Sequence, residues 1–287
     1  MSKELVITKS NELIENFIFN ATELELQILN YAVSKLHPRW DNNGVVFRIN
    51  IPELVSTFKT SSKRAYEHYR KALKRMMQRT YSYYDQNNQR HIENLVIRTT
   101  EHLSDKTWLE FKFNAFVSDR LSNLTEFFTS YNIKQIANFK SKYAFILYEF
   151  FLMRLKQCLE SKYIQTISTD LLKQNLGITD KYKRFNDFNK NVLCSAQDSI
   201  NKYSDINLDY QVIKTGRTPT HIKFTAKYKK KAQAKEIESK AAKPVEHQTE
   251  LPIEDAAKES SPGFTEHHKA TAKKHLDNLK KKTGIKT

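Results

Sequence analysis

The sequence STDLLKQNLG at residues 168–177, followed by KRFNDFNKNVLCSAQDSINKY (183–203) and LDYQVIKTGRTPTHIKFTAKY (208–228), decides the fold. Ser168 is a typical helix N-cap and Gly177 a typical helix stop, so the first segment predicts a short helix. In the second segment apolar residues recur at helical spacing and predict a longer helix. In the third they alternate on both sides of Gly216 and predict a β-hairpin.

Two further elements precede these three. Residues 140–157, rich in Tyr, Phe and Leu, predict a central core helix, and residues 164–167 predict a short strand. The order is then helix, strand, short helix, long helix and hairpin. This order is typical of a winged helix-turn-helix.

The first half of the chain repeats this order. Asn20, with Glu23 as its capping-box partner, predicts the start of a helix that His37-Pro38 ends. The pattern then predicts a strand at 45–50, a short helix at 52–58, a longer helix to Arg79 capped by Ser61 or Ser62, and strands at 81–84, 91–100 and 108–113. The halves share this pattern without convincing residue identity. We therefore expect an α+β fold of two tandem winged-helix domains, at residues 1–130 and 131–229.

Residues 230–287 differ in composition from the rest of the chain. Lys, Glu and Ala dominate, and apolar residues are too few to offset an ordering entropy of about 1–2 kcal/mol per residue. We expect a flexible, disordered basic tail there. Residues 265–282 are compatible with a weak basic helix, but a solvated tail is favoured.

The charge of the chain is strongly positive. Lys and Arg number 48 against 32 acids, a net charge of +16. From Lys229 onward there are 14 basic and 9 acidic residues, which leaves 34 against 23, an excess of 11, in the body before it. Such an excess favours polyanions, either nucleic acid or an anionic membrane surface. Because it is not confined to the tail, a binding face is favoured over charge that serves solubility alone.

The sequence lacks the motifs of several function classes. No apolar run approaches the roughly 18 residues of a membrane helix, and the N-terminus does not resemble a secretory signal. Cys158 and Cys194 form no CxxC pair, which fits a reduced cytoplasmic protein. There is no GxxxxGK[ST] phosphate loop and no His pair typical of a metal site or a DNA-nicking enzyme. We therefore expect a non-enzymatic protein without cofactor or metal.

The longer helix of the first half separates apolar from basic residues. Its apolar side is expected to pack on the body. The opposite face carries Glu67 as its only acid and five cations: Lys63, Arg64, Lys71, Lys74 and Arg75. Lys and Arg release counterions when they meet DNA phosphates, so this face predicts contact with the DNA backbone. A solvated face is the alternative.

The long helix of the second half has a mixed outer face of cations, Asn, Asp and Gln. Amides pair with adenine and a carboxylate can accept from cytosine, so this mixture favours base reading. A recognition helix uses its N-terminal part, which makes residues 183–191 the predicted base readers. Cys194 lies near this face, where a packing role is at least as well supported. At the hairpin, Lys214, Arg217 and Lys223 predict a wing on the backbone or in the minor groove.

Several segments resemble one known family. They are LVITKSNELI (5–14), ELELQIL (23–29), Tyr143-Ala144 with LYEF (147–150), LLKQNLG (171–177), and KTGR (214–217) with IKF (222–224). Their order and spacing resemble the replication initiator (Rep) proteins of iteron-bearing, theta-replicating plasmids. The resemblance covers about residues 5–228 and leaves the tail outside.

The resemblance implies a function and site residues. Family members bind tandem direct repeats of double-stranded DNA at a plasmid origin, open the origin as monomers, and recruit host initiator and helicase-loading proteins. Homodimers formed through the first domain repress the protein's own gene. Base contacts would then fall on the long helix, at Lys183, Arg184, Asp187, Lys190 and Asn191. Lys181, shortly before that helix, is a further predicted DNA-binding residue. Asp187 would repel phosphate unless it pairs with a cytosine or a neighbouring cation.

Three other functions are open. A transcription repressor with the same fold and no replication role cannot be separated from an initiator by sequence. A nicking enzyme for rolling-circle replication would need the missing His pair. A basic membrane-surface protein would bind anionic vesicles more tightly than any DNA sequence.

Overall fold

The computed structural model describes residues 4–16, 21–42, 44–60, 63–84, 89–102, 104–158 and 161–230. All of these residues belong to one compact unit. The predicted tail beyond Lys230, with its weak helix at 265–282, lies outside the described residues. So do the predicted cap residues Asn20, Ser61 and Ser62.

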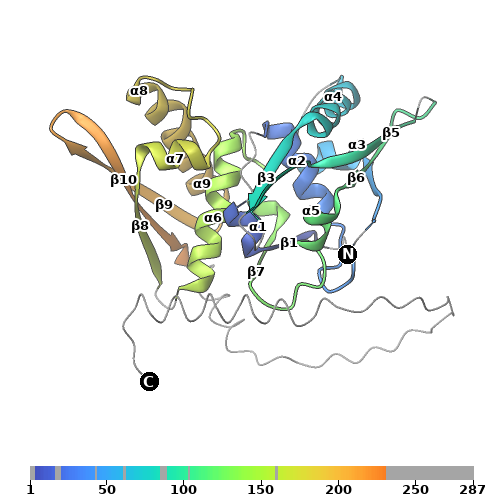
Figure 1. The fold of residues 1–287 in the computed structure, drawn as a ribbon, viewed down its shortest axis with the longest axis horizontal. Coiled ribbons are helices and arrows are strands. Elements are labelled where there is room, and N and C mark those ends of the chain that lie inside the picture. The colour runs from blue at the N-terminus through green and yellow to red at the C-terminus, as the bar shows by residue number, and fades with distance from the viewer. Residues whose placement is uncertain are drawn as a thin grey trace. The chain divides into compact units, whose positions relative to one another are not determined.

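The first winged helix follows the predicted order (Figure 1). It comprises α2 (Glu23–Val33), β2 (Phe47–Asn50), α3 (Ile51–Thr57), α4 (Ala65–Gln78), β5 (Val96–Glu101) and β6 (Trp108–Phe113). β6 lies between β2 and β5 and pairs antiparallel with both. Leu109, Phe111 and Phe113 are buried on one face of β6, as the alternation of its sequence requires.

The second winged helix has the same sheet order. It comprises α6 (Lys142–Gln157), β8 (Lys162–Ser168), α7 (Thr169–Asn175), α8 (Phe185–Phe188), a π-helix (Asn189–Cys194), α9 (Ser195–Tyr203), β9 (Ile206–Thr215) and β10 (Thr218–Tyr228). β10 lies between β8 and β9, as β6 lies between β2 and β5. The shared order of first, third and second strand supports one architecture built twice.

A separate hairpin distinguishes the first half from the second. The strand predicted at 91–100 is two strands, β4 (Arg90–Asn94) and β5, which part at Leu95. β4 pairs with β3 (Thr80–Tyr84), whereas β5 joins β6. Leu95 is fully buried; its N–H donates to the Arg79 carbonyl (3.1 Å) and its carbonyl accepts from Asn114 (3.2 Å). These long-range contacts divide a segment whose sequence alone reads as one strand.

The N-terminus of α2 corrects the predicted capping box. The cap is Thr22, not Asn20, and its partner is Glu25, not Glu23. The Thr22 hydroxyl accepts from the Glu25 N–H (3.4 Å), and the Glu25 carboxylate accepts from the Thr22 N–H (2.8 Å). The motif is therefore as predicted, but it lies two residues later in the chain.

Two other helix ends differ from prediction. α2 ends at Val33 and not at His37-Pro38, because i→i+3 bonds tighten the chain through Leu36. α4 begins at Ala65 without a side-chain capping bond, so Lys63 precedes it in a turn. The predicted helix contained that residue.

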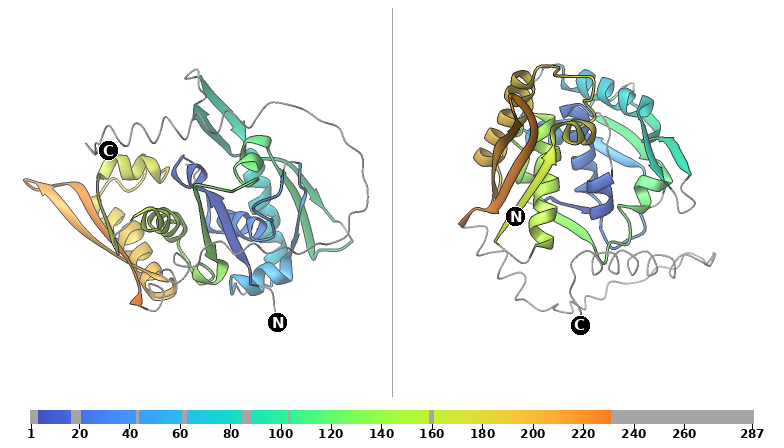
Figure 2. Two further views of the ribbon diagram at one scale, coloured as in Figure 1. Left: turned by 90° about the horizontal axis from the view of Figure 1, so that it is seen from below. Right: turned by 60° about the vertical axis from the view of Figure 1, so that its left-hand side comes forward.

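The chain also contains elements that the sequence did not predict. β1 (Val6–Ser10) pairs antiparallel with β7 (Phe128–Asn132), which lies far away in sequence (Figure 2). Three short helices accompany them: α1 (Asn11–Asn16), α5 (Ala115–Asp119) and a 3₁₀ turn (Ile133–Gln135). Lys9 on β1 forms a buried ion pair with Glu149 on α6 (2.6 Å), and one hydrophobic cluster includes residues of both winged helices.

Candidate nucleic-acid interface

α4 and the start of the recognition helix, α8, lie on the same side of the protein. In Figure 1 α4 and α8 are both at the upper edge, and the turned views agree (Figure 2). The tip of the β9–β10 hairpin extends beside α8. A duplex that met this side could therefore contact elements of both winged helices.

Acidic residues from other elements lie close to the basic face of α4. Lys74 pairs with Glu101 of β5 (3.0 Å) and Arg75 with Glu25 of α2 (3.1 Å). Arg70 pairs with Glu101 as well (3.3 Å). A helical wheel cannot show these acids, because other elements supply them. Acids from α2 and β5 therefore pair with two of the five cations, Lys74 and Arg75, and the contact of this face with DNA stays a prediction.

Lys71 is the cation on α4 whose position best fits the original prediction. It is exposed and, among the described residues, has no acid within ion-pair distance. Lys63 and Arg64 are also exposed, in the turn that leads into α4. Lys63 and Lys71 can approach a phosphate without first breaking one of the ion pairs given above. Their contact with DNA stays a prediction.

The recognition helix of the second half begins later than predicted and contains a π-turn. It begins at Phe185, so Lys183 and Arg184 lie just before its first turn. The π-helix at 189–194 shifts the backbone hydrogen bonds, and the Asn191 side-chain amide donates to the Asp187 carbonyl (2.9 Å). The amide oxygen of Asn191 is left for a base. Lys190 and Asp187 are both exposed on this helix.

Cys194 belongs to a small polar cluster under the π-turn. Its sulfur lies 3.1 Å from the Tyr210 hydroxyl, which donates to the Asn189 side-chain oxygen (2.8 Å). Asn189 also donates to the Cys194 sulfur (3.6 Å). The cluster joins the recognition helix to β9, so Cys194 has a structural role here.

A strained residue positions the start of the recognition helix. Tyr182 has φ +54°, in the left-handed region that costs a non-glycine residue about 1 kcal/mol or more. Its hydroxyl lies 3.2 Å from that of Tyr143 on α6, and its carbonyl accepts from Lys173 on α7 (3.1 Å). Burial and the contact with Tyr182 raise the pKa of Tyr143. The preceding helices therefore hold the loop that carries Lys181 and Lys183.

The β9–β10 hairpin has the geometry of a wing. Gly216 has φ +61° at its tip, which explains the glycine. Lys214 and Arg217 flank it and are exposed. Lys223 is exposed between the buried Ile222 and Phe224, so it projects from the outer face of the sheet.

A groove beside the recognition helix gathers cations that sequence analysis did not connect. We call it the cationic groove and define it by Arg79, Lys140, Lys142 and Lys181. Its volume is about 570 Å³, and Glu23 is the only acid among the described residues that line it. Burial, then Lys181 and Arg79, lower the pKa of Lys142 to about 8, while Glu25 opposes this. Only Lys181 was expected at a site, because the other three lie outside the two helical faces.

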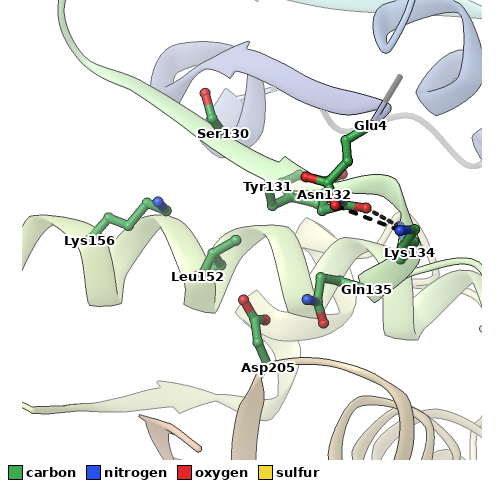
Figure 3. Close-up of a pocket in the computed structure, with 9 residues that line it drawn as sticks. All are labelled: Glu4, Ser130, Tyr131, Asn132, Lys134, Gln135, Leu152, Lys156 and Asp205. Atoms are coloured by element: carbon green, nitrogen blue, oxygen red, sulfur yellow. Dashed lines mark hydrogen bonds and ion pairs between the residues drawn. The ribbon is translucent and has the colours of Figure 1, made fainter. Parts of the chain in front are cut away.

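A second cavity, of about 380 Å³, has a balanced lining (Figure 3). It lies between β7, the 3₁₀ turn and α6. Glu4 approaches Lys134 at 3.6 Å, and Lys156 and Asp205 add one charge of each sign. The cationic groove has an excess of positive charge that this second cavity lacks.

Two family models match the chain. "Initiator Replication protein, WH1" matches residues 6–152, and "Initiator Rep protein, WH2" matches residues 168–226. The chain belongs to this initiator replication protein family. The sequence resemblance and the tandem winged-helix fold are thereby confirmed.

Known proteins that this chain resembles agree with that assignment. A curated "Replication initiation protein" of Escherichia coli is 27% identical over 217 residues, covering 71% of this chain. The chain spans 65% of that relative's length. A crystal structure of the Pi initiator protein in complex with iteron DNA matches with a TM-score of 0.66 and 21% identity, over 80% of this chain and all of the other. This likeness shows the same fold.

Two further observations concern the described residues. There, no helix is both long enough and apolar enough to cross a membrane. In the same residues no three His, Cys, Asp or Glu side chains gather as a candidate metal site. The domain boundary at residue 130 stays a prediction, and the first family model extends beyond it into α6.

Proposed function

We propose that this chain initiates plasmid replication by binding directly repeated double-stranded DNA, the iterons, at an origin. On this proposal it is a non-enzymatic cytoplasmic protein that promotes origin opening and recruits host initiator and helicase-loading proteins. Dimers formed through the first winged helix would repress the protein's own gene.

One observation carries the proposal. Two winged helices of the initiator family present α4 and α8 on the same side of the protein. Exposed cations lie on α4 at Lys71 and on either side of α8 at Arg184 and Lys190. The second also presents exposed amide and carboxylate groups, which can distinguish bases. The names of the relatives support the biological setting, since one is a replication initiation protein and another was solved with iteron DNA.

The test is selective binding to repeats beside the gene. Full-length protein should bind a duplex carrying these repeats more tightly than a shuffled duplex, by about a thousandfold or more at physiological salt. A plasmid that carries the origin should be maintained only when the protein is made. Equal affinity for both duplexes would contradict the proposal.

Two controls separate the alternatives. A repressor without a replication role would bind the repeats but fail to maintain the plasmid. A nicking enzyme would convert supercoiled origin DNA to relaxed circles in the presence of a divalent metal ion. We expect this protein to produce no relaxed circles.

A further inference from the structure

The cationic groove is lined by more cations than acids. Four cations face one lining acid, Glu23, whose pKa burial raises although Lys140 opposes this. The buried Glu25 binds Arg75 (3.1 Å) and Arg79 (2.7 Å), so Arg79 is already ion-paired and the three lysines of the groove carry its excess of positive charge. A recess with this charge pattern favours an anion over a cation or an apolar ligand.

The helix that begins in the groove adds hydrogen-bond donors. α6 is 16 residues long, and its N-cap Ser141 makes no side-chain capping bond. The backbone N–H groups of its first turn are therefore not capped by that side chain. Ser141, Lys142 and Tyr143 all line the groove. The N-terminal dipole of α6 adds to the attraction that the four cations exert on an anion.

The position of the groove indicates which anion it meets. Arg79 directly follows α4, and Lys181 lies in the loop that leads into α8. The N-terminal end of α6 lies on the same side as α4 and α8 and between them (Figure 1). A duplex that contacts both helices would therefore pass this end of α6.

We propose that the cationic groove is a phosphate-binding site that holds the backbone of bound DNA between the contacts of the two winged helices. This inference rests on the proposed function, because it requires a duplex that engages both helices. Inorganic phosphate has the same chemistry, and the experiment below separates it from a DNA phosphodiester.

The site has a pH signature because Lys142 is only partly protonated near pH 8. Several charged and titratable groups face Lys142. Glu23 and Glu25 come from α2, and Arg79 directly follows α4. Lys140 and Tyr143 lie beside Lys142 in the chain, and Lys181 and Tyr182 come from the loop before α8. A bound phosphate favours the protonated amine. DNA binding by the wild type should therefore take up a proton near pH 8 and weaken as the pH rises further, whereas Lys142→Gln should lose this dependence.

The decisive experiment couples protein variants to single phosphates. Full-length protein first selects duplexes from a random pool, and each phosphate of the selected site is then replaced in turn by an uncharged methylphosphonate. Affinity is measured for wild type, Lys142→Gln and Lys181→Gln. Lys156→Gln, at the other end of α6, is the matched control, and Lys142→Arg retains the charge.

We expect wild type and Lys156→Gln to lose about tenfold in affinity at one or two phosphates between the two helix footprints. Lys142→Gln should bind the unmodified duplex more weakly, with a salt slope lower by about one unit, and should lose little more at those phosphates. Lys142→Arg should restore the wild-type pattern. Lys181→Gln tests the same groove if Lys142→Gln fails to fold.

Other outcomes would overturn the inference. Equal methylphosphonate losses in wild type, Lys142→Gln and Lys181→Gln would show that the groove does not contact DNA. Inorganic phosphate binding that depends on Lys142, without coupling to any DNA phosphate, would make it a free-anion site. If no sequence is selected at all, the proposed function fails first.

Discussion

Glu25 is a fully buried carboxylate that joins three parts of the first winged helix. It caps α2 and binds Arg75 and Arg79. We expect Arg79→Ala to lower the free energy of unfolding by roughly 3 kcal/mol, because a buried charge would lose its shorter partner. Arg48→Ala, which removes an exposed ion pair of 3.6 Å with Glu110, should cost less than about 1 kcal/mol. Urea unfolding measures both, and equal losses would contradict this role.

Lys71 and Lys74 lie on the same helix but differ in their partners. Lys71 is exposed without an acid at ion-pair distance among the described residues, whereas Lys74 pairs with Glu101. We expect Lys71→Ala to lower the slope of log affinity against log salt by about one unit. Lys74→Ala should lower it less, since Glu101 already neutralises that charge. Binding titrations on a random duplex at several salt concentrations measure both slopes. A larger decrease in slope for Lys74→Ala than for Lys71→Ala would contradict this prediction.

Lys142 links DNA binding to stability. Its pKa in the folded protein, about 8, is below the ordinary value of 10.5. The folded state therefore binds fewer protons, and the penalty is fully present below pH 8 and disappears as the pH approaches 10.5. At pH 7 we expect Lys142→Gln to stabilise the protein by roughly 1 kcal/mol after allowance for solvent screening. Melting curves at pH 7 and pH 10 should show this gain shrinking. A loss of stability at pH 7 would contradict an energetic penalty from burial of the Lys142 charge and from its repulsion by Lys181 and Arg79.

At the scale of elements, the π-turn contains two predicted base readers that differ in their hydrogen bonds. Lys190 is exposed, whereas the Asn191 amide also donates to the Asp187 carbonyl. We expect both Lys190→Ala and Asn191→Ala to cost about 1–3 kcal/mol in binding to the cognate repeat and little on random DNA. Asn191→Ala alone should also lower stability, by about 1 kcal/mol, because it leaves a backbone carbonyl without that donor. Equal losses on cognate and random DNA would refute the recognition-helix assignment.

Elements that depend on neighbouring residues could be predicted from the sequence. Ser168 caps α7 as expected, accepting from the Leu171 N–H (3.2 Å), and Gly216 turns the wing with φ +61°. Elements that depend on distant partners could not. The β1–β7 pair joins Val6 to Asn132, and the acids that pair with α4 come from other elements. The cationic groove was missed for the same reason.

At the scale of the molecule, the two winged helices share one core through β1 and α6. Lys9 and Glu149 form the ion pair between them, with side chains 4% and 12% exposed, and the Tyr131 hydroxyl also donates to Glu149. The hydrophobic cluster continues from Ile7 to residues of both sheets. We therefore expect the described body to unfold in one transition.

The Lys9–Glu149 pair tests this coupling. Lys9→Met leaves the Glu149 carboxylate buried with Tyr131 as its remaining partner, so we expect a loss of about 3–5 kcal/mol in unfolding free energy. The double variant Lys9→Met/Glu149→Leu removes the unpaired charge and should recover most of that loss. Calorimetry with both variants measures the number of transitions as well as the energy. Two separate transitions in the wild type would show that the winged helices fold independently, and then the pair would stabilise only the contact between them.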